Sequence, residues 1–219
     1  MVEQKIILGV LNKSMQINFT ARYIKPIEVK KLEDKTYNPA VLSFVEFEPN
    51  NLDDLSTLCK VSHSWGRSYA KKIYDNAYKK FFNVQEDPTF YYGLVVPQDS
   101  YEKIDKKDVL GLVEYMPSEQ NGNFITYLQV NPNSINKSAL KENVSKVFNT
   151  IKNSLTFNDA KSRNENYKGV GTGILDALKS MTKDEPIFLV SDKSAEGFYL
   201  KNGFSKIGDD SNWFVWYRA

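Results

Sequence analysis

The sequence predicts a mixed α+β fold, and three observations favour this class. Two amphipathic segments with helical spacing, Leu52–Lys60 and Trp65–Phe82, follow a strand at Val41–Phe47. Three consecutive strands then come with only short polar turns between them. A glycine-rich loop, 166–175, opens a further helix, with Ile174, Leu175, Leu178 and Met181 on one face. Runs of helices next to runs of strands are typical of α+β proteins.

Composition excludes several classes of function. The 219 residues are 41% hydrophobic and 26% charged, with a net charge of +2, which is ordinary for a soluble globular protein and gives no overall case for nucleic acid or anionic membrane. No apolar run approaches the ~20 residues that a spanning helix needs, and no signal peptide is recognisable. One cysteine permits no internal disulfide. A cytoplasmic protein is the expectation.

The N-terminal region is predicted to be an arm or hairpin. Residues 5–24 hold two short β-rich runs, and the charged segment Lys30–Lys35 with Asn38-Pro39 has the composition of a connection. We therefore divide the chain into residues 1–39 and a main domain at 40–219.

The two predicted helices carry residues with more than one interpretation. Cys59 lies in an apolar stripe, which favours a buried packing thiol over a nucleophile. His63, the only histidine, has no second metal-binding residue at suitable spacing, so a helix-end role is preferred, substrate contact is the alternative, and no metal site is predicted. Tyrosines interleaved with lysines between Trp65 and Phe82 fit amphipathic packing better than stacking on nucleic acid.

Three strands form the predicted meander: Thr89–Val96, Val109–Met116 and Asn123–Asn131, each followed by proline. Apolar residues at helical spacing then predict an inserted helix within 133–165. After the glycine loop and its helix come a short strand at Ile187–Val190, a helix at Ser194–Asn202 closed by Gly203, and two final strands.

The glycine loop itself suits a phosphate group. Its glycines allow close approach of a ligand, and the start of the following helix presents free N–H groups. It is not a P-loop, because Ile174 stands where Lys is required after Gly173. It is not a dinucleotide fingerprint either, because Ile174 replaces the third glycine and polar residues 162–166 precede the loop instead of a strand.

Three stretches together resemble the GNAT superfamily of acyl-CoA-dependent N-acetyltransferases. Asn166–Gly171 resembles its Arg/Gln-x-x-Gly-x-Gly/Ala loop, and Leu128–Pro132 resembles the strand before that loop. Asp192–Phe204 matches its Asn-x-x-Ala-x-x-Phe-Tyr-x-x-x-Gly-Phe pattern except at the first position. The resemblance covers about residues 40–219 and implies a GNAT-like, mostly antiparallel twisted sheet flanked by helices, with an N-terminal extension and a helical insertion before the glycine loop.

The resemblance also implies acetyl-CoA as co-substrate. Backbone N–H groups from Lys168 to Gly173 would hold the pyrophosphate, and the pantetheine arm would pair along the strand near Leu128–Val130, where a main-chain N–H polarises the thioester. The implied coenzyme contacts are Leu128, Gln129, Val130, Asn166, Lys168, Gly169, Val170, Gly171, Thr172, Gly173, Asp192 and Tyr199. Tyr199 matches the family's general acid beside the sulfur; its alternative role is a packing aromatic.

Two motif positions depart from the family, since Asn166 replaces Arg or Gln and Asp192 replaces Asn. The general base is not assigned. Glu114 is the candidate, and the alternative interpretation of this residue is a solvated or paired surface glutamate. Water is a further possibility for the base. We expect acetyl transfer to a primary amine of a small molecule or peptide, with the paired helices and Trp65-Gly66-Arg67 lining the acceptor side. The alternative is a GNAT-fold module that binds acyl-CoA or a protein without turnover. A homodimer is left open.

Overall fold

The computed structural model describes residues 22–47, 52–66, 69–82, 84, 90–98, 104–117, 122–132, 167–182 and 184–218. Its helices and strands are β1 (Arg22–Glu33), β2 (Thr36–Phe47), α2 (Leu52–Ser64), α3 (Tyr69–Phe81), β3 (Tyr91–Pro97), β4 (Gly111–Met116), β5 (Asn123–Val130), β6 (Tyr167–Lys168), α5 (Val170–Met181), β7 (Ile187–Val190), α6 (Glu196–Lys201), β8 (Ser205–Lys206) and β9 (Trp213–Trp216), with a short 3₁₀ turn at Lys193–Ala195.

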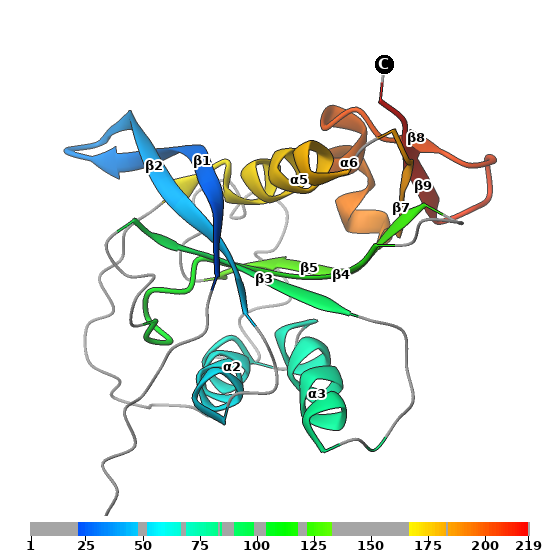
Figure 1. Ribbon diagram of the computed structural model, residues 1–219. Coiled ribbons are helices and arrows are strands. Elements are labelled where there is room, and N and C mark those ends of the chain that lie inside the picture. The colour runs from blue at the N-terminus through cyan, green and yellow to red at the C-terminus, as the bar shows by residue number, and fades with distance from the viewer. Residues whose placement is uncertain are drawn as a thin grey trace, which may run out of the picture.

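One twisted sheet forms the centre of the molecule, with helices on both faces (Figure 1). Its nine strands lie in the order β6-β1-β2-β3-β4-β5-β7-β9-β8. All neighbours pair antiparallel except β5 and β7, which are parallel. The predicted α+β class, with a mostly antiparallel sheet flanked by helices, is confirmed, as is the β3–β4–β5 meander.

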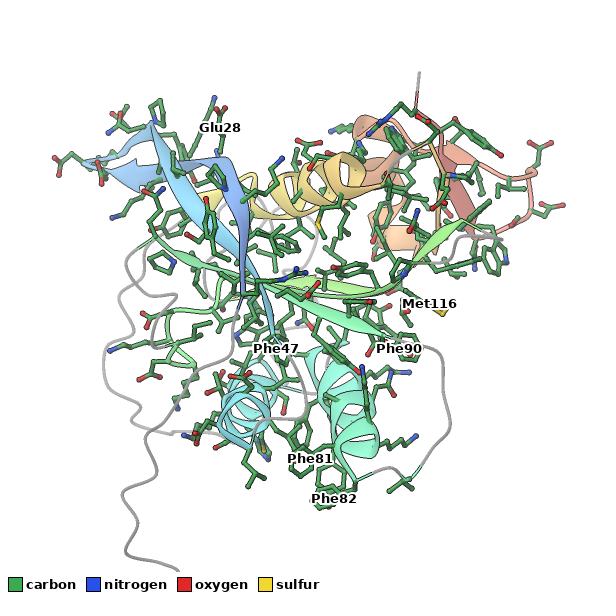
Figure 2. All side chains as sticks on the ribbon, in the orientation of Figure 1. Glu28, Phe47, Phe81, Phe82, Phe90 and Met116 are labelled. Carbon is green, nitrogen blue, oxygen red and sulfur yellow. The ribbon has the colours of Figure 1, made fainter. Side chains whose placement is uncertain are left out.

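Alternation along the strands divides the buried residues into two cores. One core packs the sheet against α5 and includes Phe44, Val95 and Val113; the other packs it against α2 and α3 and includes Val45 and Leu94. Successive side chains of a strand point to opposite faces, so each central strand contributes to both cores. Figure 2 shows Phe47 on the side of α2 and α3, whereas Glu28 lies on the opposite side.

The N-terminal hairpin corrects the predicted connection. Lys30–Glu33 belongs to β1 and Asn38-Pro39 to β2. The two strands pair from Arg22–Glu46 to Glu33–Thr36 around a turn at Asp34-Lys35, with one register shift between Tyr23 and Lys25. Both turn residues have positive φ, 47° and 68°, as a tight hairpin turn requires. The outer half of the hairpin is largely exposed, so its residues can be charged without ceasing to be strand. The composition of this segment was therefore misleading.

Other boundaries move by a few residues. α2 extends to Ser64 and α3 begins at Tyr69, later than Trp65. β7 was expected to be buried on both faces, but Val190 is 56% exposed. The predicted helix within 133–165 and the strand runs before Arg22 lie outside the described residues.

Gly93 of β3 tests how tightly the sheet packs. A Cβ at this position would lie 2.5 Å from the Phe44 ring and 2.8 Å from Val113 Cγ1. We expect Gly93→Ala to lower the free energy of unfolding by about 1–3 kcal/mol, because the core must expand. Urea denaturation measures this change. Gly197→Ala on α6 is the control: its Cβ meets nothing within 4 Å, so a loss of stability there as large as that of Gly93→Ala would contradict the packing argument.

Candidate functional site

Strands β5 and β7 diverge soon after they begin to pair. Their register runs only from Asn123–Ile187 to Ile125–Leu189, while β5 stays paired with β4 as far as Val130. A bulge in the β4–β5 ladder at Thr126 coincides with the divergence. In the part of the chain that the structure describes, no strand pairs with the β7-facing edge of β5 beyond Ile125. This open edge, residues 126–130, can accept an extended chain as an added strand.

The glycine loop lies beside this open edge. Gly169 has φ 91° and precedes α5, whose first residue is Val170. A Cβ on Gly171 would lie 3.0 Å from the Phe198 ring and 3.4 Å from Val130 Cγ2, so α5 starts where β5 and α6 meet. The N–H groups of the first helical turn, from Val170 to Thr172, have no earlier helical carbonyl to bond and can bind an anion.

Gly173 has a different role from the one predicted for its N–H group. That N–H donates to the Gly169 carbonyl at 2.8 Å, as the helix ladder requires, so it is occupied. A Cβ on Gly173 would lie 3.0 Å from Ile27 Cδ1, and the residue therefore lets α5 pack closely on β1. Gly171 and Gly173 thus serve close packing, whereas Gly169 provides the left-handed backbone before the helix.

Two lysines lie near the start of α5. Lys168 on β6 is the cross-strand partner of Lys30 on β1, and its Nζ lies 3.7 Å from the centroid of the Tyr37 ring. Like charges directly opposite each other in a ladder repel, and the positive end of the helix dipole adds to the positive potential of the two lysines. A bound phosphate would lower this positive potential. Asn166 lies outside the described residues.

Tyr199 is buried in α6, close to the divergence. It is 8% exposed, and its ring contacts those of Phe198, Phe204 and Phe214 at centroid distances of 5.1 to 6.1 Å. Burial first, and then the negative charge of Asp192, raise its pKa to about 12. The hydroxyl therefore keeps its proton at neutral pH and can donate it. The packing and acid roles are compatible, because the ring packs while the hydroxyl lies near a charged group.

Tyr69, the first residue of α3, links the two diverging strands. Its hydroxyl donates a hydrogen bond to the Asp192 carboxylate after β7, and its ring stacks on Tyr127 of β5 at 5.4 Å. The next N–H, of Ala70, donates to Gln129 Oε1 at 2.8 Å. The hydrogen bond to Asp192 is the main reason why the pKa of Tyr69 rises to about 12. No local pattern in the sequence marks Tyr69 as a site residue, because it fits the amphipathic pattern of its helix.

Glu114 is fully buried, so the surface alternative for this residue was wrong. It lies on β4 directly opposite Tyr127, and Asn76 Nδ2 donates to its two carboxylate oxygens at 3.1 and 3.2 Å. Burial raises its pKa to about 7, and the hydrogen bond from Asn76 opposes the shift. Glu114 is thus separated from the divergence by the Tyr127 and Tyr69 rings. A carboxyl that titrates near neutrality is suited to proton transfer.

Three other predicted residues lie on α2 or at its C-terminal end. Cys59 is only partly buried and His63 is exposed, with His63 Nδ1 2.8 Å from the Cys59 carbonyl oxygen and 3.6 Å from its Sγ, which is the expected helix-end role. Trp65 is 6% exposed and belongs to the core, which places it away from an acceptor surface.

Across the described residues, no group of three or more His, Cys, Asp or Glu side chains is arranged to hold a metal ion. None of the described helices is long and apolar enough to span a membrane.

The buried carboxyl of Glu114 predicts a stability difference that depends on pH. A raised pKa means that the folded chain holds this proton more tightly than the unfolded chain, so stability is lost as pH rises from about 4.5 to about 7. Glu114→Gln has no such proton. We expect the variant to gain on the order of 3 kcal/mol relative to the wild type between these limits, measured by urea unfolding. Glu28→Gln, at an exposed position of β1, is the control variant. A pH-independent effect of Glu114→Gln would refute the assignment.

The known proteins that match the chain are solved structures. No protein-family model and no curated protein matches the chain. Among solved structures, Tetrahymena GCN5 is 14% identical, with 86% of this chain and 94% of that one covered and a TM-score of 0.44. A GNAT-family acetyltransferase from Staphylococcus aureus Mu50 is 14% identical, with 80% and 98% covered and a TM-score of 0.43.

Proposed function

We propose that the chain is an acyl-CoA-dependent N-acyltransferase that moves an acetyl group from acetyl-CoA to a primary amine. The observation that supports this most directly is the open edge of β5 beside the start of α5, with the buried hydroxyl of Tyr199 close by. An extended pantetheine arm can pair with the edge while the pyrophosphate binds at the helix start. These are the two contacts that the motif resemblance implies.

The coenzyme would be held mainly by main-chain groups. Leu128, Gln129 and Val130 belong to the open edge, and Lys168 to Thr172 surround the start of α5. Asp192 is implied to contact pantetheine, but it already accepts the Tyr69 hydrogen bond. An aspartate lacks the amide donor of the family's asparagine, so its contact with the coenzyme would have to pass through Tyr69 or a water.

Direct transfer needs three events at the thioester. A main-chain N–H near Val130 polarises the carbonyl, the neutral amine attacks the carbonyl carbon, and the C–S bond breaks to give a thiolate. Tyr199 donates its hydroxyl proton to that sulfur as the general acid. The amine nitrogen loses one proton to a base as it becomes an amide. That proton, returned through water to the tyrosinate of Tyr199, restores both groups and closes the proton balance.

Glu114 is the base that we propose. Its pKa of about 7 suits acceptance of a proton at neutral pH. Because the carboxyl is fully buried behind Asn76 and Tyr127, the proton would pass through an intervening water. The acceptor would approach from the side of α3, where Tyr69 and Tyr127 lie.

The role of Tyr199 is testable with the smallest possible change. Tyr199→Phe keeps the ring contacts but removes the proton donor, so we expect kcat to fall about a hundredfold with little change in the KM for acetyl-CoA. Release of coenzyme A with a panel of primary amines measures this, and Tyr78→Phe on the exposed side of α3 is the control. Equal rates for wild type and Tyr199→Phe would exclude the acid role. Tight coenzyme binding without turnover of any amine would favour the non-catalytic module.

The pH dependence of the rate tests Glu114. With Glu114 as base, kcat/KM rises as pH increases through about 7, because the carboxyl must lose its proton before it can accept one. Glu114→Gln should remove this rise and leave only the titration of the acceptor amine. Two amines of different basicity separate the titration of the enzyme from that of the amine. If the rise of kcat/KM near pH 7 persists in Glu114→Gln, the base is another group.

A further inference from the structure

A second candidate site lies at the far end of α5. A cavity of about 170 Å³, partly open to solvent, lies between the C-terminal end of this helix and the sheet. α5 has 12 residues and is about 18 Å long, so the cavity is well separated from the glycine loop at its start. Its walls are apolar, with Leu178 and Met181 from α5 and Ile125 and Ile187 from the strands. None of the residues assigned to the coenzyme lines it.

A buried carboxylate forms one wall of the cavity. Glu46 is 8% exposed; Tyr115 donates its hydroxyl to Oε2 at 2.8 Å, and Arg22 donates through Nη2 to Oε1 at 2.9 Å. Burial and the charge of Glu46 raise the pKa of Tyr115, so its hydroxyl remains a donor. Tyr91 stacks on Tyr115 at 5.6 Å and completes an aromatic wall.

The two members of the ion pair differ in how firmly they are held. The side chain of Glu46 is 10% exposed, whereas that of Arg22 is 68% exposed. An exposed partner in an ion pair contributes little net free energy, because its guanidinium is well solvated when it turns away. The anion is therefore a fixed part of the cavity, and the cation is replaceable.

The other charges around the cavity also favour a cation. Asn123, in the wall, donates to the Glu185 carboxylate at 3.3 Å, and Met181 and Thr182 bring the negative end of the α5 dipole to the cavity. The cations nearby are engaged: Lys25 bonds Ser180 Oγ at 2.9 Å, and Arg218 bonds the Thr182 carbonyl at 2.8 Å. An incoming anion would meet Glu46 and this helix end.

We propose that this cavity binds a small primary amine with an apolar body, whose ammonium group replaces the guanidinium of Arg22 on Glu46. The ammonium would bond the carboxylate and lie near the rings of Tyr91 and Tyr115, which attract cations. The apolar body would fill the space between α5 and the strands. A cavity of about 150 Å³ is known to accept benzene, so a single ring fits.

Three probes that share one aromatic ring test which ligand charge the cavity prefers. Benzylamine, benzyl alcohol and benzoate are titrated by calorimetry into the full chain without coenzyme. We expect benzylamine to bind and the other two not to. Glu46→Gln should weaken benzylamine at least about tenfold, since a charge-assisted hydrogen bond is lost while the Tyr115 hydroxyl keeps an acceptor. Glu28→Gln, on an exposed part of the same hairpin, should leave binding unchanged.

Arg22 gives the sharper result, because its removal should improve binding. Arg22→Ala removes the competing cation, so benzylamine should bind about two- to fivefold more tightly. Arg22→Gln, which keeps a hydrogen-bond donor without charge, serves if the alanine variant does not fold, and Lys60→Ala on α2 is the matched charge control. Weaker binding in both Arg22 variants, a preference for benzoate, or no binding by wild type and both variants would overturn the proposal. Binding that is lost in Tyr199→Phe and not in Glu46→Gln would also overturn it, by placing the amine at the other end of α5.

Discussion

The short pairing of β5 with β7 is the constraint on which the rest of the site depends. A strand in the middle of a sheet must satisfy its N–H and C=O groups on both sides, yet β5 has a described strand partner on its β7 side only as far as Ile125. The bulge at Thr126 turns the strand at that point. What remains is a row of main-chain groups that a ligand can complete, held rigidly because β4 pairs with the other side as far as Val130.

Helix α5 follows from the same geometry, because it packs across the sheet beside the divergence. Its first turn needs glycine at Gly171, where Val130 and Phe198 approach, and at Gly173, where Ile27 approaches. These contacts fix the positive end of the helix next to the open edge of β5. They also fix its other end over the cavity that contains Glu46. One helix therefore joins the two candidate sites, and its close packing on β1 makes it a rigid connection.

Local patterns in the sequence predicted the parts of this arrangement that depend on local chemistry. Short-range signals mark the glycines at the start of α5, the strand that ends at Val130 and the Phe198-Tyr199 pair. All three features lie at the divergence. The Tyr69–Asp192 bond and the Arg22–Glu46 pair join residues 123 and 24 positions apart, so no periodicity could reveal them. The segment 30–39 was predicted to be a connection because exposed strands need no apolar alternation. The burial of Glu114 was not foreseen because a charged residue in a strand is usually solvated.

Two buried glutamates show how the sheet accommodates charge on its two faces, Glu46 on the side of α5 and Glu114 on the side of α3. Glu46 is neutralised by Arg22 and bonded by Tyr115, whereas Glu114, among the described residues, is bonded only by the Asn76 amide. An amide offsets little of the cost of burying a charge, so the carboxyl of Glu114 takes up a proton near neutral pH instead. A Gln at this position would satisfy Asn76 without that cost. A carboxyl at this position lowers stability above pH 7, and the proton transfer that we propose for Glu114 would account for its presence.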